Sequence, residues 1–197
     1  MFAVDLGGGA LLRPIEPWQA EEFLAHIDRA RAVVDPWIPW ASRSTDLESA
    51  RATLQRYADL QARDAGRLYG IWLDGTLVGG TMFVHFDAKA GACEIGCWLE
   101  PAGQGRGLIT KAAGHLVDWA IGVRGIHRVV WQNRPENIAS RNVAQRLGMR
   151  LEGVLREEFL YQGERHDTEV WSLLAPEWQG LTAGHATAPI SPRRGTE

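Results

Sequence analysis

The sequence predicts a single α/β domain with helices packed on a mixed sheet. A length of 197 residues suits one ordinary domain followed by a tail. Apolar residues make up 45% of the chain, which is enough for a core without disulfides or a structural metal. Segments in which apolar residues have the spacing of a strand occur both before and between segments in which they have the spacing of a helix. The strand segments include one long hairpin. These three observations favour one mixed domain over separate helical and strand domains.

The N-terminal third is expected to form a short strand and two helices. Residues 10–15 read as a strand that Pro14 breaks. A helix opens at 16–18, where an early proline lacks only an N–H that would be unpaired anyway. The segment 35–40 places two prolines among two tryptophans and cannot be regular helix. A second helix is expected from Ser44–Asp46 to about Asp64.

Strand patterns dominate the middle of the chain. Residues 68–73 and 76–85 flank Asp74-Gly75, a pair that suits a type I′ hairpin turn. A further strand over about 92–99 ends before Pro101.

The C-terminal half alternates turns, helices and strands. A glycine-rich turn at 103–107 leads into a helix over 109–122, and a strand over 127–133 follows. Asn137 is the expected N-cap of a helix that ends at Gly148. The remaining expected elements are two strands, 159–161 and 169–174, around a turn at 162–165, then a tail without periodicity over 181–197, which leaves 1–180 as the domain.

Composition excludes several classes of function. A formal net charge of −3 argues against a protein held to nucleic acid by overall basicity. No apolar run approaches the roughly 18 residues of a membrane span, and the N-terminus lacks a leader pattern, so a cytoplasmic location is expected. Cys93 and Cys97, four residues apart on one strand, are about 13 Å apart and cannot bridge. Six scattered histidines predict no metal site.

The turn Gly103-Gln104-Gly105-Arg106-Gly107 is the sharpest local feature. Alternate glycines let backbone N–H groups approach a ligand, and the helix N-terminus behind them favours a phosphate. A tight turn that binds nothing explains the glycines equally well. The turn lacks the Gly-Lys-Ser/Thr ending of a Walker A loop, and its GxGxG spacing fits a dinucleotide fingerprint poorly.

The loop and five further segments together resemble the GNAT superfamily of acyl-CoA-dependent N-acetyltransferases, in its RimJ/RimL branch. Residues 104–109 resemble the Q/R-x-x-G-x-G/A pyrophosphate loop, although Ile109 replaces its last small residue and is expected to narrow the approach to the pyrophosphate. Residues 93–99 resemble an "IGYWL" strand with Cys97 in place of the aromatic residue. Residues 133–149 resemble an N-x-x-S helix, and the likeness extends over about 10–178. The segments 151–153, 158–160 and 36–40 match the branch in order.

The resemblance implies a single GNAT-like domain whose central sheet is mixed, mostly antiparallel and flanked by helices on both faces. The sheet is expected to open after Trp98-Leu99 to admit acetyl-CoA, whose pantetheine arm would pair with the open edge. Backbone donors near Leu99 would hold the thioester oxygen. No metal is implied. The residues expected to bind the cosubstrate are Trp98, Leu99, Gln104, Gly105, Arg106, Gly107, Leu108, Ile109, Thr110, Asn133, Asn137 and Ser140.

The resemblance also implies roles on the acceptor side. Ser140 would help the CoA thiolate leave, although the position also suits a residue that only supports a helix start. Glu158 would be the base at the amine, with Glu94 as the alternative; a charge cluster such as 156–158 is otherwise a solvated strand edge. Trp37 and Trp40 would line the acceptor pocket, unless they belong to the core.

The expected activity is transfer of an acetyl group by direct attack of an amine. At pH 7, deprotonating an α-amine of pKa about 7.8 costs about 1.1 kcal/mol, against about 4.6 kcal/mol for a lysine. A single carboxylate acting as the base is therefore sufficient for an acceptor that is a peptide or protein N-terminus. Acetylation of a small amino metabolite or antibiotic, and a catalytically silent acyl-CoA-binding regulatory module, remain alternatives, with a dinucleotide-dependent oxidoreductase the most distant. The sequence leaves a homodimer open.

Overall fold

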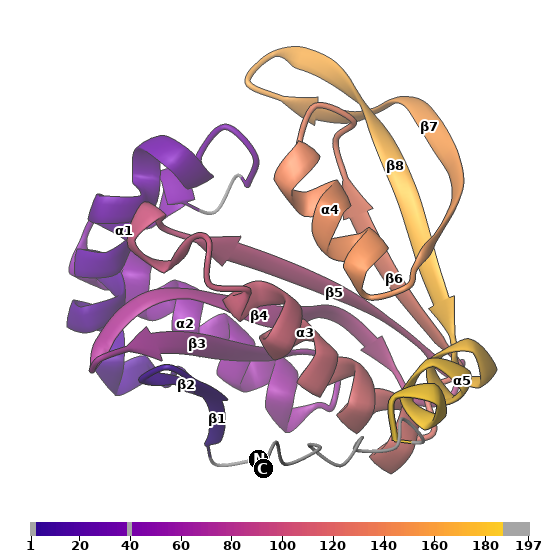
Figure 1. Cartoon of the computed structure of the whole chain (residues 1–197). Helices are drawn as coiled ribbons and strands as arrows, with labels where there is room; N and C mark the ends of the chain where they lie inside the picture. The colour runs from indigo at the N-terminus through magenta and orange to yellow at the C-terminus, as the bar shows by residue number, and fades with distance from the viewer. Residues whose placement is uncertain (1–2, 39–40, 187–197) are drawn as a thin grey trace, which may run out of the picture.

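The computed structural model describes residues 3–38 and 41–186, which form one eight-stranded sheet with helices on both faces (Figure 1). The strand order is β1-β2-β3-β4-β5-β6-β8-β7. Every neighbouring pair is antiparallel except β5 and β6, which run parallel. The predicted mixed, mostly antiparallel sheet is confirmed.

The chain begins with a hairpin at one edge of the sheet, β1 (Val4–Gly7) and β2 (Ala10–Pro14). β1 was not expected from the sequence. After a 3₁₀ turn at Pro17–Gln19 come α1 (Ala20–Val34), a second 3₁₀ turn (Ala41–Arg43) and α2 (Leu47–Ala62). The carboxylate of Asp46 caps α2 by accepting from the Ser49 N–H at 2.8 Å, which satisfies one of the unpaired donors of the first turn.

The next three strands are β3 (Arg67–Leu73), β4 (Thr76–Asp87) and β5 (Ala92–Leu99). At the β3–β4 turn, φ is +49° at Asp74 and +82° at Gly75. Positive φ at both central residues is the signature of a type I′ turn, which confirms the predicted hairpin.

A 3₁₀ turn (Pro101–Gly103) joins β5 to α3, and the remaining elements complete the second half of the fold. They are α3 (Leu108–Asp118), a π-helical turn (Trp119–Val123), β6 (Arg128–Asn133), α4 (Ile138–Arg146), β7 (Arg150–Tyr161), β8 (Glu164–Leu174) and α5 (Ala175–Ala186).

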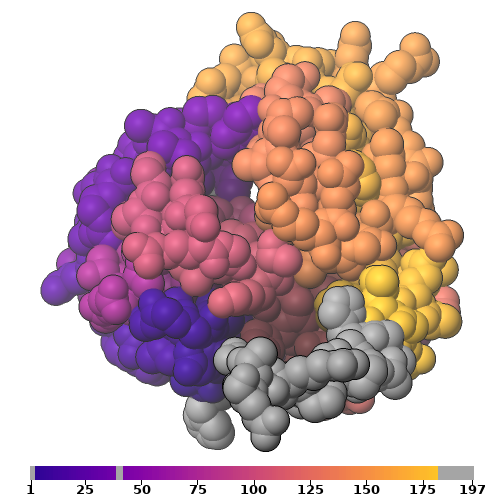
Figure 2. Space-filling model, in the orientation of Figure 1, coloured from indigo at the N-terminus to yellow at the C-terminus, as the bar shows by residue number. Residues whose placement is uncertain are grey.

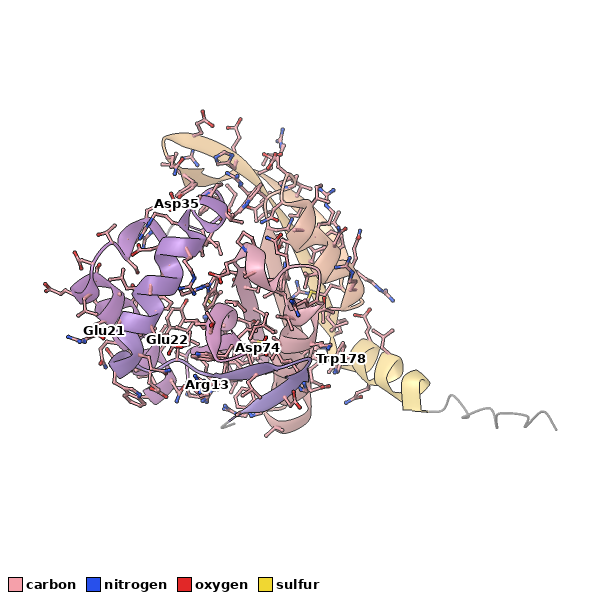
Figure 3. All side chains as sticks on the ribbon, turned by 60° about the vertical axis from the view of Figure 1, so that its left-hand side comes forward. Arg13, Glu21, Glu22, Asp35, Asp74 and Trp178 are labelled. Carbon is pink, nitrogen blue, oxygen red and sulfur yellow. The ribbon has the colours of Figure 1, made fainter. Side chains whose placement is uncertain are left out.

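Two of these C-terminal elements are longer than expected, and one is new. β7 and β8 extend well beyond 159–161 and 169–174, because β7 is an edge strand without a single buried residue and so carries no alternation of buried and exposed positions. α5 covers the first residues of the segment expected to be a tail, and 187–197 lie outside the described residues. The Trp178 indole of α5 (Figure 3) donates to the Asp118 carboxylate at 2.7 Å, which holds α5 against the end of α3.

The core lies on both sides of the sheet. On one face α1 and α2 bury Phe23, Ile27 and Leu54 against Trp72 and Trp98 of the strands. On the other face α3 packs against strand residues that include Ile71, Phe83, Ile95 and Trp131. In the described part of the chain, no helix has the length and apolar character to span a bilayer.

The sheet parts between β5 and β6. These strands pair only at Ala92–Arg128, Cys93–Val129 and Glu94–Val130. Beyond Glu94, β5 stays paired with β4 as far as Leu99, while β6 stays paired with β8. The opening therefore begins after Glu94, and the prediction that it begins after Trp98-Leu99 is wrong. Each strand follows its antiparallel partner, and the accumulated twist carries the two strands apart earlier than their ends.

Candidate functional site

A cavity of about 460 Å³ lies where the two halves of the sheet part. In Figure 2 it opens between purple α1, the pink glycine-rich loop with α3, and orange α4. Its lining brings together most of the residues expected to bind a cosubstrate: Trp98, Leu99, Gln104, Gly105, Gly107, Leu108, Ile109, Thr110, Asn137 and Ser140. Val33, Val34, Trp37, Ile38, Cys97, Gly103, Ala139, Asn142, Val143 and Arg146 complete the wall.

The backbone of β5 presents an unpaired edge to this cavity. The Glu100 N–H donates to the Val78 carbonyl at 2.8 Å, so backbone groups at this register point toward β4. Because backbone groups alternate along a strand, those of Cys97 and Leu99 point the opposite way, toward the side that β6 has left. An extended ligand can therefore pair with β5 as an additional strand would.

The glycine-rich loop is shaped by positive φ angles. Gly105 has φ +73° and Gly107 φ +69°, a region that side chains other than glycine rarely adopt. Gly103 is needed for space instead, because a Cβ there would lie 2.7 Å from a methyl carbon of Leu99. The three glycines of the loop are therefore required for two different reasons: Gly105 and Gly107 for their backbone conformation, and Gly103 for space.

The first turn of α3 completes an anion-binding corner. The first intrahelical bond runs from the Lys111 N–H to the Gly107 carbonyl at 3.1 Å, so the N–H groups of Leu108 to Thr110 have no intrahelical acceptor. Together with the helix dipole they favour a phosphate group. Ile109 is 7% exposed and packs into the core beneath α3, so most of its bulk is directed away from the loop surface.

Two of the expected cosubstrate residues do not line the cavity. The Arg106 side chain is exposed and absent from the wall. The Asn133 amide donates at 2.9 Å to Glu169, whose carboxylate also accepts from Arg141 and from the Trp171 indole. Asn133 therefore belongs to a buried network that fixes the start of α4 to the sheet.

Ser140 lies in the first turn of α4 and faces the cavity. Its backbone N–H donates to the capping Asn137 Oδ1 at 3.1 Å, and its Oγ accepts from the Trp131 Nε1–H at 2.9 Å. Because the indole occupies one lone pair, the hydroxyl proton of Ser140 is available to a group in the cavity. The bond from Trp131 was not predictable from spacing, since it joins a strand to a helix.

Trp37 lines the cavity, and its ring lies under the guanidinium of Arg134, with Arg134 Cζ 4.6 Å from the ring centroid. Trp40, the other tryptophan expected here, lies outside the described residues. A second contact holds the same segment: the Tyr161 hydroxyl donates to the Asp35 carbonyl at 2.6 Å. Figure 3 shows Asp35 at the end of α1, below the tip of the β7–β8 hairpin.

Glu158 is placed by a bulge in β7. Between paired positions, β7 has three residues (156–158) where β8 has only Asp167. Within the bulge, Glu157 has φ +53° and its N–H donates to the Asp167 carboxylate at 2.8 Å. Bulges commonly redirect a side chain. Here the exposed Glu158 carboxylate accepts from the buried Thr168 hydroxyl at 2.9 Å.

Glu94 lies on β5 at the point where β6 departs, and it is half-buried. Burial raises the pKa of its carboxyl, and the negative charge of Glu158 raises it further, while His85 acts in the opposite direction. The two carboxylates considered as bases are thus close enough to interact. Neither of them is among the residues that line the cavity.

A buried network that sequence reasoning missed supports the β5 end of the cavity. The Trp98 indole donates to His26 Nε2 at 2.8 Å, which leaves Nδ1 protonated to donate to Glu100 at 3.2 Å. Arg29 also donates to Glu100 at 3.2 Å. Burial, with the nearby charge of Arg29, lowers the pKa of His26 to about 4, so the ring is neutral at physiological pH. No local motif encodes these contacts, which join α1 to residues about 70 positions away.

The two cysteines differ in their surroundings, because Cys97 is half-buried and lines the cavity, whereas Cys93 is fully buried. Burial raises the pKa of the Cys97 thiol to about 12, so it remains protonated at neutral pH. Among the described residues no group of three or more histidine, cysteine or acidic side chains is placed to hold a metal ion.

Comparison with known proteins gives a consistent family. The sequence pattern of the acetyltransferase (GNAT) domain matches residues 10–150. A putative ribosomal N-acetyltransferase of Bacillus subtilis, YdaF, is 30% identical over 91% of this chain and 99% of its own length. The ribosomal-protein-serine acetyltransferase of Escherichia coli is 31% identical over 61% of this chain and 68% of its own.

A solved structure shows the same fold. The ribosomal L7/L12 α-N-protein acetyltransferase RimL, in complex with coenzyme A, superposes with a TM-score of 0.82. The match covers 87% of this chain and 97% of that protein, at 22% sequence identity.

Proposed function

This chain belongs to the GNAT acetyltransferase family and is an acetyl-CoA-dependent N-acetyltransferase, and we propose that its acceptor is the α-amine of a protein or peptide N-terminus. The observation that carries this proposal is the likeness to a putative ribosomal N-acetyltransferase along nearly that protein's whole length. A small amine fits the reaction chemistry as well, so the acceptor class needs a direct test.

The cavity fits acetyl-CoA. The N–H groups at the start of α3, with the left-handed turns at Gly105 and Gly107, suit a pyrophosphate. The open edge of β5 at Cys97 and Leu99 suits an extended amide chain. The exposed side chain of Arg146 adds a cation at the wall. When bound, acetyl-CoA supplies an acetyl group activated as a thioester.

Ser140 is proposed to stabilise the departing sulfur. A thiol has a pKa of about 8.5, so the thiolate does not need a strong acid and a hydrogen bond is sufficient. The Trp131 indole fixes the orientation of the Ser140 oxygen, and the position in the first turn of α4 places the hydroxyl beside a helix N-terminus. Both features favour negative charge at that point in the cavity.

Glu158 is proposed to accept the proton of the amine, with Glu94 as the alternative. The bulge in β7 and the Thr168 hydroxyl position the Glu158 carboxylate. Burial raises the pKa of the Glu94 carboxyl by destabilising its charged form, and a raised pKa makes the carboxylate a stronger base. An α-amine of pKa about 7.8 needs only modest assistance from either carboxylate.

The acceptor class is tested by offering acetyl-CoA with three sets of amines and measuring release of free thiol. The sets are unblocked peptides, the same peptides with a blocked N-terminus and an internal lysine, and small amines including free amino acids. The proposal expects acetylation of the unblocked peptides at the α-amine, located by fragmentation mass spectrometry. Turnover confined to small amines or to lysine side chains would refute the proposed acceptor while leaving the family assignment intact.

A further inference from the structure

Arg134 stacks on a residue of the cavity wall and has no ion-pair partner among the described residues. It lies in the loop between β6 and α4, and its guanidinium packs on the ring of Trp37, a residue that lines the cavity. Its Nε is buried and has no hydrogen-bond acceptor within residues 3–38 and 41–186. No carboxylate of those residues forms an ion pair with it.

Arg13, Arg67 and Arg134 each have a buried Nε without an acceptor, but Arg67 forms an ion pair through a terminal nitrogen, as Arg124 and Arg141 do. Arg67 and Arg124 both bind Asp64, and Arg141 binds Glu169. A buried donor without an acceptor lowers the stability of the fold, and a charged one lowers it more. A guanidinium cannot relieve that cost by losing its proton. Because Arg134 stacks on Trp37, which lines the cavity, a ligand in the cavity is the candidate for the missing acceptor.

We propose that Arg134 is a specificity-determining residue that binds a carboxylate of the acceptor polypeptide, on the side chain of its second or third residue. This inference rests on the proposed peptide acceptor. A carboxylate fits better than a main-chain carbonyl, because it both accepts from the planar guanidinium and neutralises its charge. The acceptor's ammonium would face the acidic pair Glu158 and Glu94, so the two charges of the acceptor find opposite charges on the enzyme.

Arg13 provides a matched control. Its guanidinium also packs on an indole, that of Trp72 at 3.9 Å, and its Nε is also buried without an acceptor. It lies on β2, however, which is separated from the parting strands by β3 and β4, and its partner Trp72 does not line the cavity, whereas Trp37 does. Replacing either arginine with methionine removes a stacked guanidinium, but only the guanidinium of Arg134 lies on a residue of the cavity wall.

The experiment compares kcat/KM for peptides of equal length that differ only by Asp or Asn at position 2 or position 3. We expect the wild type to prefer Asp by at least tenfold at one of these positions. Arg134→Met should abolish the preference while keeping kcat/KM for the Asn peptides within about threefold. Arg13→Met should retain the preference for Asp over Asn. As a measurement that needs no variant, the Asp preference of the wild type should shrink between 50 and 500 mM salt, since screening weakens an ionic contact.

The remaining outcomes overturn the inference in distinguishable ways. Equal turnover of Asp and Asn peptides by the wild type would show that Arg134 does not bind a carboxylate of the acceptor. An equal loss for both peptides in Arg134→Met, with a persistent Asp/Asn ratio, would show that Arg134 only supports the loop. Failure of the wild type to acetylate any unblocked peptide would overturn the proposed function and this inference together.

Discussion

Replacing Ser140 with alanine separates a chemical role of the hydroxyl from a structural one. The helix cap survives the change, because Asn137 accepts from the backbone N–H of residue 140 and not from its side chain. What is lost is the acceptor of the Trp131 indole, which is 1% exposed. Leaving that N–H unpaired should lower the free energy of unfolding by about 1–3 kcal/mol.

The kinetic effect of Ser140→Ala is expected to be larger than a folding defect explains. A hydrogen bond to a charged group contributes about 1.5–3 kcal/mol. If the hydroxyl donates to the departing thiolate, its loss should lower kcat by about 10- to 150-fold. The affinity for CoA should change by less than about threefold, because the bond is made as charge develops. Steady-state kinetics with thiol detection measures kcat, and calorimetry measures CoA binding.

Trp131→Phe is the matched control for this prediction. It removes the indole donor but keeps the Ser140 hydroxyl, so it should lower the stability while reducing kcat by less than about fivefold. The reasoning is refuted if Ser140→Ala keeps kcat within threefold of the wild type. It is also refuted if both variants lose kcat equally, since packing would then explain the effect.

Three further results are expected. Gly107→Val should weaken CoA binding at least tenfold in calorimetry, because a β-branched residue resists φ +69°. Unchanged CoA affinity would show that the loop does not bind the pyrophosphate. Glu158→Gln should lower kcat/KM below the pKa of the amine and recover about two pH units above it, and a flat deficit would transfer the role of base to Glu94. Hydrogen bonding to Arg124 lowers the pKa of Asp64 to about 2, so its stabilisation is present above pH 3.8 and is lost as the pH falls through about 2. Asp64→Asn, which tolerates the left-handed backbone at φ +56°, should therefore lower Tm by a few degrees at pH 7 and by less at pH 2.

Local patterns predicted the elements whose cause is local. Asp74-Gly75 specifies its turn through two positive φ angles, and Asn137 caps α4 through its own side chain. The glycine-rich turn was placed correctly at the start of α3 for the same reason. In each case the residues that determine the conformation are neighbours in the chain.

Contacts between distant segments could not be read in this way. β7 carries no buried residue, so its length was underestimated, and the bulge that positions Glu158 has no sequence signature. The point where β5 and β6 part depends on how each strand pairs with its other neighbour. The stacking of Arg134 on Trp37 joins segments almost 100 positions apart, and neither residue type indicates the other.

The parting of β5 from β6 also has a consequence for aggregation. It leaves unpaired backbone in the middle of a sheet, and an exposed edge of this kind can template pairing with the strand of another molecule. Here the edge is recessed within the cavity between α3 and α4, so a foreign sheet cannot reach it while a single extended chain can. The recess therefore restricts strand addition to narrow ligands. A ligand that fills it should suppress intermolecular β-pairing during heating and should also stabilise the folded state.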